Sequence, residues 1–383
     1  MKARSRSGKV PLPLGKPDIP VSALRDIRAI LASGFLVEGA HTAAFSAALA
    51  AHAGVPHAIL VNSGANALYL ALSAAGIGPG DAVIVPAFSF PATANVVAWL
   101  GALPLFADID PGTWNLDADT VAARAAALPA SLRRRIKAVM PVQAFGNPVA
   151  MGPLLELADA RGWSVIEDAA CAIGSRLDGR ACGTHGLMGC LSFHPRKILT
   201  TSEGGAILTR DAKLARRLSL LKNHGMERAG GKVRFPGIGL NLRFTEIAAA
   251  LGMSQLRRLD AMLSERARQA ALYRQGLDKA GFRMQECVEG AEPNHQSVVA
   301  RLPGASARRR DRILAGLAAR GIQATIGTYY LPALPAFRGL PGAAPCPAAA
   351  AVFRETFSLP LFPGLGAEGI ARVTEALRAL AKA

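Results

Sequence analysis

The feature that most constrains the fold is a regular alternation of short apolar runs with helix-like segments, which begins near Ala58. The apolar runs predict strands at residues 58–61, 82–85, 104–108, 137–141, 164–167, 190–193 and 206–208. Segments with helical spacing lie between them, at residues 65–75, 93–100, 116–127 and 151–160. Strands that alternate with helices build a mostly parallel sheet covered on both faces. The predicted class is therefore α/β, with ligands at the carboxyl ends of the strands.

The length of the chain predicts more than one unit. It has 383 residues, of which 51% are hydrophobic, enough for a large core and two domains. We expect a flexible arm at residues 1–16, a large domain at 17–258 and a smaller α+β domain at 259–383. One long helix is predicted over 245–280, a strand at 297–302, a helix at 308–320, a strand at 322–326, a loop at 332–350 and a last helix at 367–381.

Charge and cysteine content narrow the function classes. The formal net charge is +17, which reflects either an Ala- and Arg-rich composition or an attraction to phosphorylated partners. Basic residues are scattered without interleaved aromatics, so no nucleic-acid partner is expected. No uncharged apolar run reaches the roughly 20 residues that span a bilayer, so no membrane partner is expected. The five cysteines show neither a CxxC pair nor zinc spacing, which predicts no metal site and a reducing, cytoplasmic location.

Two charged residues follow neighbouring predicted strands. Lys197 lies between an apolar run and a Thr/Ser/Gly turn, and Asp168 ends the run that starts at Val165. A lysine and a carboxylate at adjacent strand ends suit pyridoxal 5'-phosphate, because the lysine forms the Schiff base and the carboxylate pairs with the pyridinium nitrogen. Two alternatives remain open at this point: Lys197 as a solvated surface charge, and Asp168 as a helix N-cap.

Other segments suit the rest of such a cofactor. Ser63 and Gly64 join a predicted strand to a helix, and N–H groups at a helix start bind phosphate well. Ser192 could add a hydroxyl to the same phosphate. Phe90 could cover one face of the ring, although an aromatic at this position is more often part of a core.

Taken together, these segments resemble the DegT/DnrJ/EryC1/StrS family of pyridoxal-phosphate sugar aminotransferases, from about residue 17 to the C-terminus. The motifs that carry the resemblance occur in family order, at residues 34–39, 63–64, 88–93, 108–110, 141–142, 167–170, 192–205, 239–243 and 359–363. The resemblance implies the aspartate-aminotransferase fold, fold type I, with a mostly parallel seven-stranded sheet and a smaller C-terminal domain.

The resemblance also implies residue roles. Lys197 holds the cofactor and then moves the substrate proton, while Asp168 binds the pyridine nitrogen. The other cofactor contacts would come from six further residues. The phosphate is bound by the backbone at Gly64 and Ala65 and by the Ser192 hydroxyl, the ring stacks on Phe90, its phenolic oxygen lies near Cys171, and Asn241 reaches the phosphate in the neighbouring subunit. A homodimer with shared active sites follows from the last role.

The implied reaction moves an amino group from L-glutamate or glutamine to a nucleotide-linked 3-keto- or 4-keto-deoxysugar. Four departures from the family pattern concern the ligand side: Cys171 replaces Gln or His, Ala65 replaces Thr, Gln143 replaces His, and no His follows Tyr330. A non-nucleotide keto substrate, or a non-catalytic regulatory or binding role, therefore remains an alternative. Sugar dehydration is disfavoured because the lysine is retained.

Overall fold

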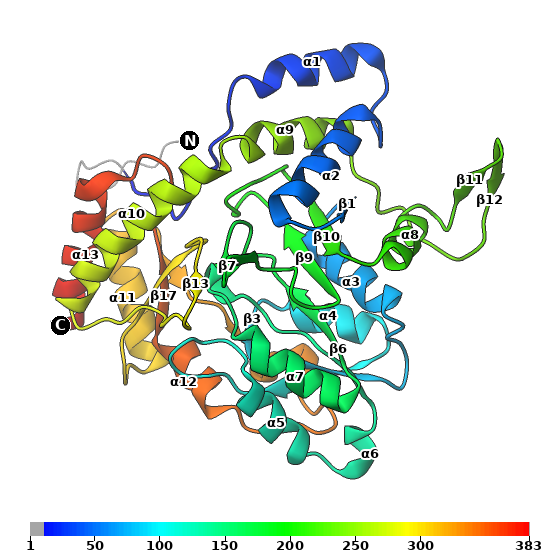
Figure 1. The fold of residues 1–383 in the computed structure, drawn as a ribbon. Coiled ribbons are helices and arrows are strands. Elements are labelled where there is room, and N and C mark those ends of the chain that lie inside the picture. Colours follow the sequence, from blue (N-terminus) through cyan, green and yellow to red (C-terminus); the bar gives the residue numbers. More distant parts are fainter. Residues whose placement is uncertain (1–10, 383) are drawn as a thin grey trace.

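A computed structural model describes residues 11–382, which surround a central sheet of seven strands (Figure 1). Its order is β1 (His57–Val61), β10 (Gly205–Thr209), β9 (Met188–Ser192), β6 (Ser164–Asp168), β5 (Ile136–Val139), β2 (Ala82–Pro86) and β4 (Leu103–Ala107). Strand β10 is antiparallel to both of its neighbours, and the other adjacent pairs are parallel. All seven predicted strands are thus confirmed. The register sets Asp168 of β6 opposite Cys190 of β9, two residues before Ser192.

Helices cover both faces of this sheet (Figure 1). Alternate residues of β1 enter different cores: Ile59 and Val61 pack with α3 (Gly64–Ala74) and α4 (Ala92–Trp99), whereas Ala58 and Leu60 pack with α2 (Ala40–Ala53) and α9 (Glu246–Leu256). At the other end of the second face, β2 and β5 pack with α5 (Ala118–Ala126) and α7 (Met151–Arg161). This period-two alternation is expected for strands buried on both faces.

The predicted long helix over 245–280 is wrong as a single element. It is two helices, α9 and α10 (Leu259–Asp278), separated at Arg257 and Arg258. The backbone of Arg258 leaves the helical region, with φ −110° and ψ 2°. This break lets Leu259 enter the core between the sheet and helices α2 and α9. Farther along α10, Tyr273 enters the core of the C-terminal unit.

The C-terminal unit has its own three-stranded sheet, ordered β14 (Val298–Arg301), β17 (Thr356–Leu359) and β15 (Thr325–Ile326). Helices α11 (Ala307–Ala319) and α13 (Gly366–Lys382) pack on it, as predicted. The predicted strand 322–326 is shorter, because Ile322 pairs with Leu12 instead. The predicted loop 332–350 is partly wrong, since α12 (Pro347–Glu355) begins within it at a proline suited to a first turn.

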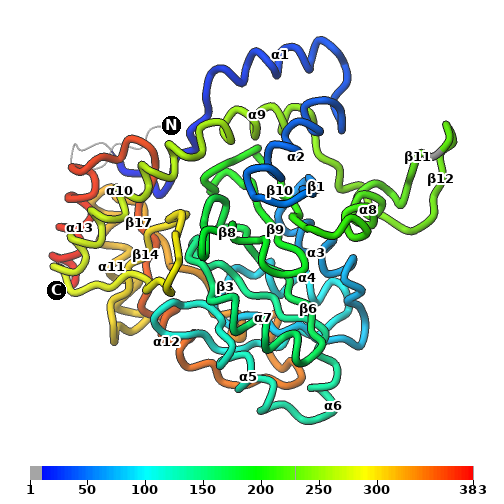
Figure 2. Tube along the Cα trace, in the orientation of Figure 1, coloured from blue at the N-terminus to red at the C-terminus, as the bar shows by residue number. Residues whose placement is uncertain are grey.

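Short elements complete the chain. They are α1 (Ala23–Ser33), β3 (Phe88–Ser89), α6 (Ala130–Arg133), β7 (Arg176–Leu177), β8 (Arg180–Ala181), α8 (Ala212–Leu221), β11 (Glu227–Ala229), β12 (Lys232–Arg234), β13 (Ala291–Glu292) and β16 (Tyr329–Tyr330), with 3-10 turns at Ala144–Gly146, Leu331–Ala333 and Pro335–Phe337. Strand β16 pairs with β3 and so joins the two units near Phe90. The β11–β12 hairpin extends away from the body (Figure 2).

Residues 1–10 of the predicted arm lie outside the described residues, but residues 12–14 are docked rather than free. The Leu12 N–H donates to Gly321 O at 2.9 Å, and the Leu361 N–H donates to Leu14 O at 3.0 Å. All five cysteines are free thiols. Within residues 11–382, every helix is too short or too polar to cross a membrane.

Candidate active site

Asp168 lies at the carboxyl end of β6 and is buried, with 5% of its surface exposed. Its carboxylate accepts hydrogen bonds from the Thr93 hydroxyl at 2.8 Å and from the Ala170 N–H at 3.2 Å. Burial raises the pKa of Asp168, and the two hydrogen bonds and Lys197 oppose this rise. The helix-cap alternative is wrong, because residues 170–174 form turns rather than a helix.

Lys197 lies in the loop that follows β9 and is partly buried. Its ammonium donates a hydrogen bond to the Cys171 thiol, with a distance of 2.9 Å between Nζ and Sγ. The surface-charge alternative is therefore wrong, since the side chain is directed toward the segment that follows Asp168. Sequence reasoning had brought Lys197, Asp168 and Cys171 into one site, and the structure places them together.

The loop that carries Lys197 is held by a side chain from the C-terminal unit. The amide of Gln296 accepts from the Ile198 N–H at 3.0 Å and donates to Arg196 O at 2.7 Å. Gln296 is buried, and its bond to the Ile198 N–H is shielded from water. The two bonds flank Lys197 and fix the backbone on either side of it.

The first turn of α3 forms a close contact with β9. The Ser63 hydroxyl accepts from the Asn66 N–H at 3.1 Å and caps the helix. A Cβ on Gly64 would lie 2.6 Å from the Ser192 Cβ, so only glycine fits there without displacement. The first N–H groups of a helix have no partner within it and attract anions. Gly64, Ala65 and the Ser192 hydroxyl thus surround a place suited to a phosphate.

Two of the predicted site residues, Phe90 and Asn241, have exposed side chains. Phe90 is 63% exposed and makes an edge-on contact with Tyr329, with 6.2 Å between ring centroids. Asn241 is exposed and pairs with Asn223 at the base of the projecting hairpin.

The departure at Gln143 has a structural explanation. Its amide donates to the Glu167 carboxylate at 3.0 Å and accepts from the Val149 N–H at 2.7 Å. Gln143 and Glu167 are both fully buried, and Glu167 also accepts from the N–H groups of Gly183, His185 and Gly186. Gln143 therefore supports the sheet edge and does not face a ligand, so it carries no information on the substrate.

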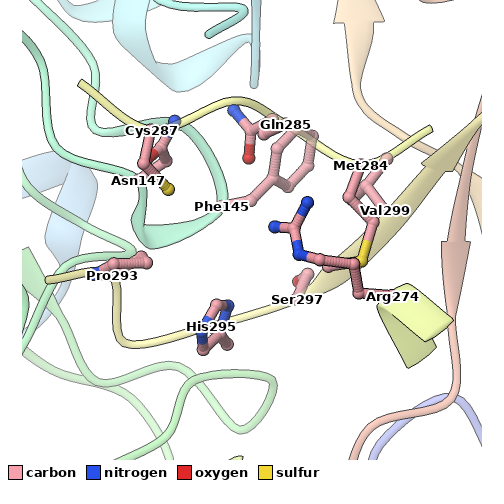
Figure 3. A pocket seen from close by; sticks show the side chains of 10 residues that line it. All are labelled: Phe145, Asn147, Arg274, Met284, Gln285, Cys287, Pro293, His295, Ser297 and Val299. Carbon is pink, nitrogen blue, oxygen red and sulfur yellow. The ribbon is translucent and has the colours of Figure 1, made fainter. Parts of the chain in front are cut away.

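A small cavity lies between the two units, beside the segment that carries Gln296 (Figure 3). The guanidinium of Arg274 projects into it between Phe145 and His295. Asn147 contributes a buried Oδ1 that has no hydrogen-bond partner among the described residues. Burial, together with Arg274 and Arg266, lowers the pKa of His295 to about 4. The cavity measures about 20 Å³, room for roughly one water molecule.

Sequence reasoning missed three residues that shape the site. Thr93 was noted within a motif, but its bond to Asp168 requires knowing that α4 begins beside β6. Gln296 and Arg266 gave no local signal, because each acts on residues distant in sequence. Their polar side chains gave no signal by themselves. What marks these residues is that they are polar and buried, and burial could not be predicted from one sequence.

The residues present fit pyridoxal phosphate. Such a cofactor needs three groups, and all three are present. They are a buried carboxylate, a lysine amine directed into the site, and a glycine at a helix start, where there is no room for a side chain. Each was found in the position expected from the strand order. The ring and phosphate sites are thus supplied by different strands of one sheet edge.

Comparison with known proteins agrees with this chemistry. Residues 17–378 match the DegT/DnrJ/EryC1/StrS aminotransferase family. The chain is 41% identical over 281 residues to GDP-perosamine synthase of Caulobacter vibrioides, which covers 73% of this chain and 74% of that one. It is 34% identical to a UDP-N-acetyl-3-dehydro-alpha-D-glucosamine 3-aminotransferase of Acidithiobacillus ferrooxidans, with coverage of 93% and 92%.

A solved structure shows the same fold. The aminotransferase TlmJ from Streptoalloteichus hindustanus superposes with a TM-score of 0.88 at 34% identity, covering 96% of this chain and 98% of its own. The family match and the fold both agree with the lysine, the carboxylate and the proposed phosphate site described above. The chain therefore belongs to the DegT/DnrJ/EryC1/StrS aminotransferase family and is a pyridoxal-phosphate-dependent aminotransferase.

Proposed function

We propose that this aminotransferase moves an amino group from L-glutamate or glutamine to a keto-deoxysugar joined to a nucleoside diphosphate. The observation that carries the proposal is the Lys197 amine, held 2.9 Å from Cys171 Sγ beside the buried Asp168. The sugar-nucleotide class is supported by the relatives, whose names specify a GDP-linked and a UDP-linked sugar.

Lys197 and Asp168 have distinct roles in this proposal. The cofactor supplies an electron sink when it is bound. Lys197 would hold it covalently and, once released, would carry the proton to and from the substrate carbon. Asp168 would accept a hydrogen bond from the pyridine nitrogen and keep that nitrogen protonated. The Thr93 hydroxyl donates to this carboxylate and restricts its orientation, which supports that role.

The remaining contacts orient the cofactor. The backbone N–H groups of Gly64 and Ala65 and the Ser192 hydroxyl would bind its phosphate. Phe90 would cover one face of the ring, and Cys171 would lie near the phenolic oxygen. A thiol donates a weaker hydrogen bond than the amide or imidazole usual in the family, so we expect Cys171 to contribute less than they do.

The active unit is proposed to be a homodimer in which Asn241 reaches the neighbouring cofactor. Large apolar side chains are exposed on the segments nearest to it, including Phe235 at 65% and Ile238 at 92%. Exposed apolar surface of this kind is typical of protein interfaces. Mixing inactive Lys197→Ala and Asn241→Ala subunits tests the shared site. Recovered activity in the mixture would support a shared site. A mixture that is no more active than its two component variants would contradict it.

The substrate class is tested with purified protein and pyridoxal phosphate. We expect L-glutamate-dependent amination of one member of a panel of nucleotide-linked 3-keto and 4-keto sugars, detected by product mass. If only free keto compounds are aminated, the substrate is a non-nucleotide metabolite and the proposed nucleotide-linked substrate is wrong. Loss of all turnover with normal cofactor binding would favour a non-catalytic role.

A further inference from the structure

A larger cavity, of about 190 Å³, opens beside Lys197. It lies between the Lys197 loop, the docked N-terminal segment and the C-terminal sheet. Among the described residues, its lining includes no aspartate or glutamate. Its charged lining residues are all basic: Lys16, Arg196, Lys197 and Arg266.

Arg266 is the unusual member of this lining. It is only 8% exposed, and its Nη1 donates to two neutral acceptors, His295 O at 3.0 Å and Gln296 O at 3.2 Å. Within residues 11–382 no ion pair to Arg266 is found. The adjacent Glu265 carboxylate accepts instead from Gln269 and Gly364.

A buried guanidinium without an anion is unfavourable, because carbonyl oxygens satisfy its N–H groups but do not balance its charge. Burial accordingly lowers the pKa of Arg266 to about 10, and Glu265 offsets this only partly. The guanidinium has five N–H donors, and the two bonds described engage only Nη1. Arg196 and Lys16, both exposed, add positive charge around the same cavity.

We propose that this cavity binds a carboxylate group of the amino-acid donor, with Arg266 as its principal partner and Arg196 as a second. The inference rests on the proposed function and names the substrate subsite within it. A volume of about 190 Å³ suits a short dicarboxylate. It falls below the roughly 300–1,000 Å³ of sites for larger ligands, so we expect it to hold part of a substrate rather than a complete nucleotide sugar.

Calorimetric titration of glutarate into the cofactor-loaded protein tests the proposal, because glutarate has two carboxylates and no reactive amine or ketone. We expect binding that weakens about tenfold or more in Arg266→Lys and Arg196→Ala, as charge-assisted hydrogen bonds are lost or distorted. Arg268→Ala, an exposed position on the same helix, is the matched control and should bind glutarate normally. Arg196 has an exposed side chain, so its variant should fold even if the Arg266 variant does not.

Steady-state kinetics provide the second readout. Arg196→Ala should raise KM for the amino donor and leave KM for the keto substrate unchanged. Glutarate binding that is absent, or equal in Arg196→Ala and Arg268→Ala, overturns the proposal. Competition between UDP and glutarate, with Arg196→Ala weakening UDP, would assign the cavity to the nucleotide diphosphate instead. If transamination itself fails, glutarate binding still reports on the cavity, so the two failures are distinguishable.

Discussion

Replacing Gly64 with alanine adds one carbon atom to the proposed phosphate site, which is formed by Gly64, Ala65 and Ser192. The new Cβ would lie 2.6 Å from Ser192 Cβ, 2.9 Å from its Oγ and 3.2 Å from its Cα. Comfortable carbon contacts are about 3.5–4.0 Å, so α3 and β9 must separate by nearly 1 Å. The nearby Cα belongs to the backbone of a central strand, so a side-chain rotation cannot relieve the contact.

The expected magnitude combines two opposing effects. Overpacking of this kind destabilises by about 1–3 kcal/mol, whereas Gly→Ala stabilises a helix interior by about 0.5–1 kcal/mol and stabilises less at the first helical position, which Gly64 holds. We therefore expect Gly64→Ala to lower the free energy of unfolding by about 0.5–2 kcal/mol. Because the backbone N–H groups move away from the phosphate, cofactor affinity should fall about tenfold or more.

Urea unfolding of the cofactor-free protein, followed by circular dichroism, measures the first effect, and pyridoxal phosphate titration measures the second. Gly152→Ala is the matched control: it lies in α7 with no atom within 4 Å of its Cβ, so it should be neutral or stabilising. Ser192→Gly should partly rescue Gly64→Ala in a double-mutant cycle. The account is refuted if Gly64→Ala matches Gly152→Ala in both stability and cofactor affinity.

Three further predictions concern two groups of the site, Asp168 and Cys171, and His295 of the small cavity. Burial raises the pKa of Asp168, so the cofactor-free protein should lose stability as the pH rises from the pKa of the unfolded chain through that of the folded protein. Asp168→Asn should abolish this loss in urea titrations taken up to pH 8, and it should weaken cofactor binding. Unchanged cofactor affinity would contradict the role assigned to Asp168. Burial lowers the pKa of His295 from 6.5 to about 4, so stability should fall by up to about 3 kcal/mol as pH drops from 6.5 to 4. His295→Asn, which suits the positive φ of 50°, should flatten that slope, and an unaltered slope would place the titration elsewhere. Cys171→Ala should weaken cofactor binding by about tenfold at most in spectroscopic titrations, since a thiol is a weak hydrogen-bonding group; complete loss would show that Cys171 does more than proposed.

The sheet could be predicted from sequence because its strands are continuous apolar runs between helical segments. All seven runs became strands, and this placed Asp168 and Ser192 at neighbouring strand ends. The break at Arg258 was not predictable, because residues 245–280 keep helical spacing throughout. It is imposed by tertiary packing, which draws Leu259 into the core below the sheet.

The cofactor-side residues were predictable because each is local to a strand end or helix start. The supporting residues were not, since Gln296 is about a hundred residues from the loop it holds, and Arg266 acts through the backbone near it. Gln143 shows the opposite error. Its sequence position suggested a ligand contact, whereas its amide is fully occupied by Glu167 and Val149.

The central claim is that Lys197 holds the cofactor. Borohydride reduction of the protein loaded with pyridoxal phosphate, followed by peptide mass spectrometry, tests it most directly. The account predicts one modified peptide, carrying the cofactor mass on Lys197, and its loss in Lys197→Ala with loss of the visible absorbance. Modification of a different lysine, or retained absorbance in Lys197→Ala, would contradict the account.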